Sequence, residues 1–474
     1  MLRRTLLTRA PMLLAAAALV PGLACRETPA ATAGTLRLLA PARPGREARM
    51  GAWNERQTGG AGRLELLHPP DGADWSAALA AFLAASPEGA ELLWLDLLDL
   101  PQLALRRRLA GLQGRVKRDR FNLKQFMPPA LQAGYGLDEE LYALPEEVEA
   151  AQVYFNRDHF QAAGIDMRRS GFDFERPDMT WEGLRRASLD LLSAPRPGGR
   201  VPFFPGHDGA PLELWGWQNG GEWLSADGRR ASFTLPPHVE ALGWLVAHGR
   251  ELGSAAAQAG EARDGEDRPE AHPLLQGRVS ICVDGTRLVS AVTGWHAAFP
   301  LGYVETPRRE RNRPLVSWNR ATGYAMSAGA PDAAWDALRF LISEAAAAAD
   351  AAASAALAPL SPETVTEGAP RPGPAPGRPL WYPPYTGQLA LDEQLAQRYL
   401  IGSKLLDEGR DHGLEQLRYA RSRPASPAPR EIWPLLSEAR RRALRGEVSP
   451  QEALAEAQRE AQARLDGAWR ALGR

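Results

Sequence analysis

Short apolar runs alternate with helical segments along the first quarter of the chain, and this alternation restricts the fold more than any other feature. Strand-like runs cover residues 35–39, 63–67 and 91–95. A helical segment is expected between each pair of runs, the second from about residue 75 to 85, and a further helix over residues 101–112. Strands that alternate with helices predict right-handed βαβ units and a mainly parallel sheet. The expected fold class is therefore α/β.

Later segments continue the mixed pattern. Two more strands are expected at residues 142–145 and 153–155. Thr180 precedes a run of periodic apolar residues and is predicted to cap a helix. The Pro- and Gly-rich stretch 368–379 is expected to be irregular. Further helices are predicted at residues 239–252, 333–342, 345–358, 431–444 and 450–465.

The N-terminus has the order of an export signal. Three arginines among the first nine residues precede an apolar run at residues 11–20, and small residues follow up to Cys25. Residues 1–24 are therefore predicted to be a signal peptide. The residues around Cys25 resemble a bacterial lipobox, which implies lipidation of Cys25 as the first mature residue. The alternative is simple cleavage after Ala24 or near Ala33, which leaves a free protein.

Charge and cysteine content exclude several classes of protein. The net charge is −1 over 474 residues, which is no electrostatic footprint for nucleic acid or an anionic membrane. Outside the leader no segment reads as a membrane-spanning helix, so a lipid on Cys25 would tether the chain rather than embed it. Cys282 lies in an apolar strand-like run and is expected to be a small buried hydrophobe. The eight histidines are scattered, so neither a metal site nor a cofactor is expected.

A family resemblance rests on several landmarks that occur in one order along residues 36–466. They are Leu-Tyr-Ala-Leu-Pro at 141–145, Tyr-Phe-Asn-Arg-Asp at 154–158, Pro177 with Thr-Trp-Glu at 180–182, Asn-Gly-Gly at 219–221, Leu-Gln-Gly-Arg-Val at 275–279, Asp-Gly at 284–285, Ala-Trp at 334–335 and Gly-Glu-Val-Ser-Pro at 446–450. In this order and spacing the chain resembles the sugar-type extracellular solute-binding proteins of ABC importers, including the maltose-binding kind.

The resemblance implies the periplasmic-binding-protein fold, in which two discontinuous α/β lobes are joined by a hinge of crossover strands and enclose a ligand cleft. Residues 36–148 and 299–344 are expected to form the N-terminal lobe, and residues 149–298 and 345–474 the C-terminal lobe. The implied function is that of an exported, periplasmic or cell-surface receptor. It would bind a small polar ligand, first of all a carbohydrate, by hinge closure and deliver it to the permease subunits of an ABC transporter. A monomer without enzymatic activity or nucleic-acid binding is expected.

Candidate ligand-binding residues follow from the chemistry of sugars. Hydroxyl groups need hydrogen-bonding side chains, since an unpaired buried polar group costs about 1–3 kcal/mol, and the flatter sugar faces suit aromatic rings. The resemblance places Glu149 at the first crossover, Trp94 and Asp96 at the cleft edge, and Trp433 at a C-terminal cleft position. The alternatives are a solvated carboxylate for Glu149 and core packing for the tryptophans.

Other candidates are less tied to the family pattern. Trp318 and Asn319 lie in a polar stretch, Trp381 lies in the Pro-rich connection, and Asp208 precedes an aromatic segment. Arg287 departs from the pattern, because the family usually has an aromatic residue there. A guanidinium favours a carboxylate or phosphate, so Arg287 suggests an anionic ligand such as a uronate or a polyol phosphate. The alternative is an arginine that is salt-bridged at the rim of the cleft.

Three other functions remain open at the level of sequence. A secreted hydrolase could use a pair of carboxylates, which leaves no local motif, although no nucleophile elbow, HExxH motif or phosphate-binding loop is found. A sensory accessory that reports its ligand to a kinase or chemoreceptor would have the same sequence pattern. A receptor that has lost its ligand is the third alternative.

Overall fold

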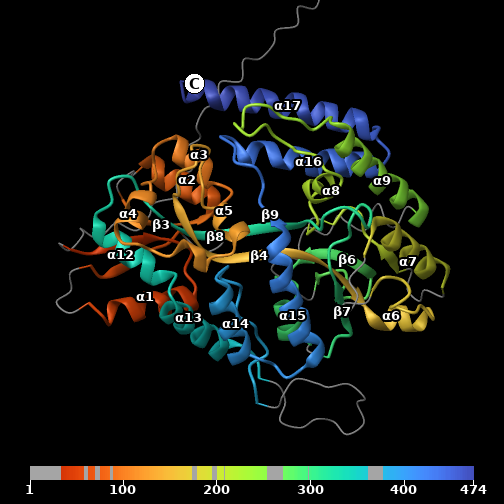
Figure 1. Cartoon of the computed structure of the whole chain (residues 1–474), viewed down its shortest axis with the longest axis horizontal. Coiled ribbons are helices and arrows are strands. Elements are labelled where there is room, and N and C mark those ends of the chain that lie inside the picture. The colour runs from red at the N-terminus through yellow and green to blue at the C-terminus, as the bar shows by residue number, and fades with distance from the viewer. Residues whose placement is uncertain are drawn as a thin grey trace, which may run out of the picture.

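Strand β4 (Ala143–Asn156) crosses the middle of the molecule and belongs to both halves of its sheet structure (Figure 1). The computed structural model describes residues 34–57, 62–69, 75–85, 89–172, 179–194, 200–207, 209–253, 271–296, 298–360 and 377–473. Within these ranges the other strands are β1 (Leu36–Leu39), β2 (Leu64–Leu67), β3 (Leu92–Asp96), β5 (Val201–Phe203), β6 (Val279–Gly285), β7 (Leu301–Val304), β8 (Ser317–Met326) and β9 (Ala420–Arg421).

Helices cover both halves of the sheet structure (Figure 1). The helices of the first half of the chain are α1 (Pro44–Asn54), α2 (Trp75–Ala85), α3 (Leu100–Leu105), α4 (Gln113–Arg118), α5 (Pro128–Gln132), α6 (Arg157–Ala162), α7 (Trp181–Ser193) and α8 (Leu212–Gln218). Those that follow are α9 (Pro236–Leu252), α11 (Arg287–His296), α12 (Asp332–Leu341), α13 (Glu344–Leu357), α14 (Leu389–Arg398), α15 (Lys404–Gln416), α16 (Pro429–Leu444) and α17 (Pro450–Ala471).

The first half of the sheet has the strand order β2-β1-β3-β8-β4. Strand β1 pairs in parallel with β2 and β3, as the alternation of strands and helices predicts. Strand β8 lies between β3 and β4 and runs antiparallel to both. Because β8 comes from a distant part of the chain, this half is assembled from two separate segments. Such a discontinuous lobe is what the sequence resemblance implies.

Strand β4 changes partners in its middle. Residues 143–150 pair with β8, and residues 151–155 pair with β6 in the register Ala151↔Gly285. Strand β7 pairs with the same part of β4, and β5 pairs in parallel with β6. The two strands predicted at 142–145 and 153–155 are therefore one continuous strand. Pro145 is accommodated by a register shift between Pro145 and Glu147, which interrupts the hydrogen-bond ladder at that point.

Most predicted helices are present, with shifted ends. The Thr180 hydroxyl accepts a hydrogen bond from the Gly183 N–H at 3.0 Å and caps α7 as predicted. The helix predicted over residues 101–112 is shorter, because α3 ends at Leu105 and Arg107 takes a left-handed conformation with φ of 57°. Of the stretch expected to be irregular, residues 368–376 lie outside the described residues. Cys282 is buried in β6, as expected.

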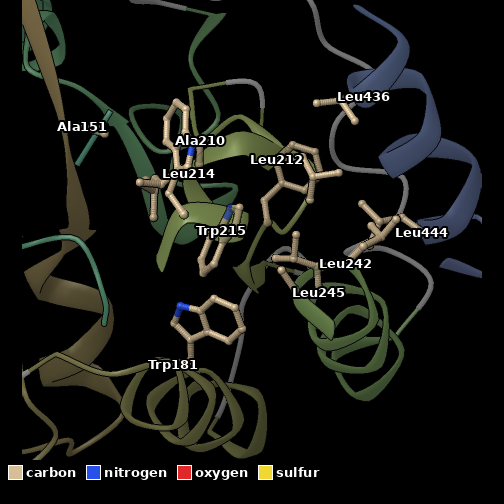
Figure 2. Packing of buried hydrophobic residues seen from close by; sticks show 14 of the residues in the cluster. Ala151, Trp181, Ala210, Leu212, Leu214, Trp215, Leu242, Leu245, Leu436 and Leu444 are labelled. Atoms are coloured by element: carbon tan, nitrogen blue, oxygen red, sulfur yellow. The ribbon is translucent and has the colours of Figure 1, made fainter. Parts of the chain in front are cut away.

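The largest hydrophobic core lies around the second half of β4. Trp181 of α7 and Trp215 of α8 are both buried, and their rings meet edge to face with centroids 5.6 Å apart. Figure 2 shows them between Ala151 of β4 and the leucines of α9 and α16, so that helices from four parts of the chain share one core. Several tryptophans of the sequence are therefore committed to packing.

A buried ion cluster fixes the first half of β4 to the neighbouring helices. Glu146 pairs with Arg46 at 3.2 Å and Arg43 at 2.9 Å, and Arg49 pairs with Asp350 of α13 at 2.6 Å. Burial alone would raise the pKa of Glu146, but the three guanidinium groups, that of Arg43 foremost, bring it well below its ordinary value. Breaking a buried pair leaves an uncompensated charge, so the cluster holds α1, α13 and β4 in one arrangement.

The predicted lobe boundaries, which stay a prediction, agree with the packing at one position and differ from it at two. The expected crossing near Val148 falls inside β4, close to its change of partner. Two segments pack against residues that were assigned to the other lobe. Strand β7 pairs with the second half of β4, and α13 packs against α1.

Among the described residues no single helix combines the length and apolarity needed to cross a membrane. Helices α12 and α13 pass that test only as a pair, and the chain bends by 53° between them.

Removal of one buried ring from this core should destabilise the protein. We expect Trp215→Ala to lower the free energy of unfolding by about 3–5 kcal/mol, because it removes a buried ring and leaves a cavity. The matched control is Trp295→Ala, since Trp295 is 40% exposed, and it should change stability by less than about 0.5 kcal/mol. Urea unfolding followed by circular dichroism measures both. Equal losses in the two variants would contradict this account of the core.

Candidate functional site

A cavity of about 840 Å³ lies where β4 passes from one half of the sheet to the other. We call it the central cavity. It receives residues from both halves, since Arg43 follows β1 whereas Arg287 begins α11. Its lining also includes Glu147, Glu149, His207, His272, Asp284, Trp318, Arg320, Trp381, Tyr382, Tyr385 and Arg410. The wall therefore combines carboxylates, guanidinium groups and aromatic rings, which can bind a polar molecule through both its hydroxyl groups and its apolar faces.

A second cavity of about 740 Å³ adjoins the end of β3. It is lined by Asp96, Asn319, Glu222 and Arg430, among others, and we call it the second cavity. Trp318 and Arg320 line both cavities. They are two residues apart on β8, and successive side chains of a strand alternate between its faces, so the two side chains lie on one face. They form a wall that the two cavities share.

Glu149 and Arg287 form an ion pair inside the central cavity. The Arg287 Nη1 lies 3.1 Å from the Glu149 Oε1, and the side chains are 50% and 12% exposed respectively. Burial raises the pKa of Glu149 to about 7, although Arg287 and Arg320 oppose this shift. A Cβ atom on Gly285 would lie 2.6 Å from the Glu149 carboxylate. A side chain at position 285 would therefore crowd the present position of this carboxylate.

Two histidines and an aspartate form a cluster in the wall. His207 Nε2 lies 2.6 Å and His272 Nε2 lies 2.8 Å from the same oxygen, Asp284 Oδ2. Burial alone would raise the pKa of Asp284, but the two imidazoles, His207 first, bring it well below its ordinary range. Sequence reasoning missed this cluster, because its residues come from three separate segments. The only local signal was Asp284 at the end of a predicted strand.

The structure brings six of the predicted residues into the two cavities and leaves their roles as predictions. Glu149, Arg287, Trp318 and Trp381 line the central cavity. Trp318 also lines the second cavity, and within the described residues its indole N–H has no hydrogen-bond partner. The ring of Trp381 meets Tyr399 edge-on at 5.7 Å.

Asp96 and Asn319 line the second cavity and are both engaged. Asp96 pairs with Arg430 of α16 at 3.0 Å, and Arg430 also binds Asp99 at 2.8 Å. The Asn319 amide donates hydrogen bonds to the Pro129 carbonyl at 3.0 Å and to Ser422 at 2.9 Å. Arg430 thus links α16, in the second half of the molecule, to the end of β3 in the first.

Two predicted aromatic residues lie away from both cavities. Trp94 donates its indole N–H to the buried Glu146 at 2.7 Å, and Arg46 lies over its ring at 4.8 Å. Trp433 is 2% exposed in the large core and stacks with Phe233 at 6.4 Å. The position of Trp433 matches the alternative considered for the tryptophans, which was core packing. Asp208 and Cys25 lie outside the described residues.

This arrangement is the fold of ABC transporter solute-binding proteins. Two sheet halves share crossover strands, and a polar cavity lies where they meet. The cyclic alpha-maltosyl-1,6-maltose binding protein of Arthrobacter globiformis matches with a TM-score of 0.68 and 18% identity, covering 92% of this chain and all of that one. An ABC substrate-binding protein of Listeria monocytogenes, solved with cycloalternan, has a TM-score of 0.66 and 17% identity, covering 91% of this chain and 99% of that one.

A third structure has the same fold. The solute-binding protein of Thermotoga lettingae bound with alpha-D-tagatose has a TM-score of 0.63 and 18% identity, and covers 91% of this chain and all of that one. No family model and no curated protein sequence matches the chain. The likeness confirms the predicted periplasmic-binding-protein fold.

The position of Glu149 predicts a pH dependence of stability. Folding raises its pKa from 4.5 to about 7, so the folded state holds a proton that the unfolded state releases between these values. The contribution of Glu149 to the free energy of unfolding is therefore fully present below pH 4.5 and is lost as the pH rises to about 7. We expect Glu149→Gln to remove this loss, which amounts to about 2–3 kcal/mol.

Urea unfolding below pH 4.5 and above pH 7 measures this effect. The control is Glu147→Gln, which removes the same charge from a neighbouring position on β4. If the two variants and the unsubstituted protein share one pH dependence of stability, Glu149 does not hold the proton.

Proposed function

We propose that this protein is an extracytoplasmic receptor of an ABC importer that binds a small polar solute, most directly a carbohydrate, in the central cavity. The observation that carries the proposal is this cavity at the crossover of β4, in a fold shared with solved proteins that bind cyclic maltosyl-maltose, cycloalternan and tagatose. Its volume of about 840 Å³ lies in the range of small-molecule sites. The receptor binds by hinge closure and hands the solute to permease subunits without converting it.

The lining of the cavity supports recognition of a polyhydroxylated molecule. The Glu149 carboxylate accepts hydrogen bonds from hydroxyl groups, and guanidinium groups such as that of Arg320 donate them. Trp318 offers both a ring and an unpaired N–H donor, and Trp381 offers a second ring. These are the two kinds of contact that the rim and the faces of a sugar require.

The charge of the solute is a finer part of the proposal. Arg43, Arg287, Arg320 and Arg410 all contribute to the cavity wall, which suits an acidic sugar or a polyol phosphate. Against this, Arg287 is already paired with Glu149 at 3.1 Å. The pair favours a neutral sugar, whose hydroxyl groups bridge the two charges. If the solute is neutral, Arg287→Ala should weaken the binding of neutral and acidic sugars alike. If the solute is anionic, the variant should lose affinity for acidic sugars and keep its affinity for neutral ones.

Ligand binding tests the proposal directly. Calorimetric titration with neutral oligosaccharides, uronates and polyol phosphates should identify a ligand whose affinity falls about 10- to 100-fold in Trp318→Ala, because a ring and a donor are both lost. Trp318→Phe keeps a ring but lacks the N–H, so its loss should be intermediate. The control is Trp295→Ala, at an exposed position outside the cavity lining, and it should bind like the unsubstituted protein.

Other outcomes would exclude the proposal or favour its alternatives. Conversion of the bound sugar would indicate a hydrolase. Binding without any effect of a gene deletion on uptake would favour a sensory accessory to a kinase or chemoreceptor. If no carbohydrate or related polar ligand binds, the proposal is wrong and a receptor that has lost its ligand becomes the better description.

We also propose that residues 1–24 direct export and that Cys25 carries a lipid. The support is the order of charged, apolar and small residues before Cys25. When the full chain is expressed in a bacterium, the protein should appear in the membrane fraction. Cys25→Ser should move it to the soluble extracytoplasmic fraction without changing ligand affinity, since the lipid only tethers the protein. An unchanged distribution would rule out lipidation and support simple cleavage.

A further inference from the structure

The cluster in the wall of the central cavity brings together four side chains that bind metal ions in other proteins. His207 follows β5, His272 precedes β6, and Cys282 and Asp284 belong to β6. One donor atom from each of these side chains lies within 4.8 Å of every other. Cys282 and Asp284 are two residues apart on one strand, so both side chains are on the same face.

The two imidazoles converge on one point. Both Nε2 atoms are directed at Asp284 Oδ2, at 2.6 Å and 2.8 Å, and the rings stand edge to face at 5.5 Å. Asp284 is itself oriented, because its Oδ1 accepts a hydrogen bond from the Gly285 N–H at 2.6 Å. A tetrahedral ion with bonds of about 2.0–2.3 Å to nitrogen, oxygen and sulfur would hold the donors roughly 3.3–3.7 Å apart, so the two nitrogen–oxygen distances lengthen and the widest separations, within 4.8 Å, shorten.

We propose that His207, His272, Asp284 and Cys282 bind one divalent transition-metal ion of the zinc class. The donor set of two nitrogens, one oxygen and one sulfur suits four-coordinate zinc and not calcium or magnesium, which take oxygen ligands. The site goes beyond the sequence-based expectation of no metal. That expectation rested on the small number of cysteines and the scatter of the histidines along the chain, whereas the fold brings these donors together from three segments.

Binding requires three local changes. Both Nε2 atoms donate a hydrogen bond to the Asp284 carboxylate, so His207 and His272 each bind the ion through Nε2 only if the ring proton moves to Nδ1. For His272 the hydrogen bond from the Leu274 N–H to Nδ1 is then lost. This contact is long, at 3.3 Å, so little is lost with it. The buried Cys282 thiol gives up its proton to the solvent as sulfur bonds to the ion. No other covalent bond changes.

The ion has a defined structural effect. It joins the segments that carry His207 and His272 to strand β6, and so fixes one wall of the central cavity. Because His207, His272 and Asp284 line that cavity, the added positive charge lies beside the space where a solute binds. Metal binding is measured without any sugar, so its outcome is independent of the proposed function.

Metal titration of the chelator-treated protein tests the site. We expect one Zn²⁺ per chain, with affinity at least about 100-fold lower in His272→Gln and in Asp284→Asn, since loss of even an outer-shell partner costs 10- to 100-fold. The control is His296→Gln, an exposed histidine at the end of α11, and it should bind like the unsubstituted protein. Circular dichroism of the metal-free variants confirms that each is folded.

Cobalt(II) gives a second readout that depends on the ligands themselves. The cobalt-loaded protein should show the intense visible absorption of a four-coordinate site and a thiolate-to-metal charge-transfer band. Cys282→Ser should remove the charge-transfer band. Equal zinc affinity in all variants, no binding at all, or a cobalt spectrum without a thiolate band would overturn the proposed site.

Discussion

The antiparallel pairing of β4 with β8 is the interaction on which the rest of the structure depends. Strand β4 is hydrogen-bonded to β8 up to Ala150 and to β6 from Ala151 onward, so one strand orients both halves of the molecule. Both alanines are fully buried, and their small side chains let layers pack closely at the junction. Both strands also contribute directly to the lining of the central cavity, β4 through Glu149 and β8 through Trp318 and Arg320.

Charge is distributed unequally about this junction. On the first half of β4 the carboxylate of Glu146 is surrounded by guanidinium groups, with no room for a ligand. Three residues further on, Glu149 pairs with Arg287, which is half exposed. Glu146 thus fixes the architecture, whereas Glu149 lines the cavity. The difference in their pKa values, one lowered and one raised, follows from the number of cations around each.

The sequence was sufficient for the first three strands and several helices, because these depend on local patterns, whereas strands β7 and β8 and helices α14 and α15 were not predicted. The cap at Thr180 and strands β1 to β3 were found from residue type and periodicity alone. The site was only partly predictable, since burial is decided by distant segments. Trp433 occupies the core because α9 and α17 pack over α16, and Trp94 is turned towards Glu146, 52 residues away. The cluster at Asp284 left no local pattern.

The wall shared by the two cavities has a thermodynamic consequence. Trp318 and Arg320 face both spaces, so a molecule that displaces either side chain from one cavity reshapes the other. Occupancy of the two spaces is then coupled, and linkage requires the coupling to be reciprocal. If a molecule in one cavity changes the binding free energy of a molecule in the other, the second molecule changes the binding free energy of the first by the same amount. Strand β8, which carries both side chains, is in this way also the partition between the two cavities.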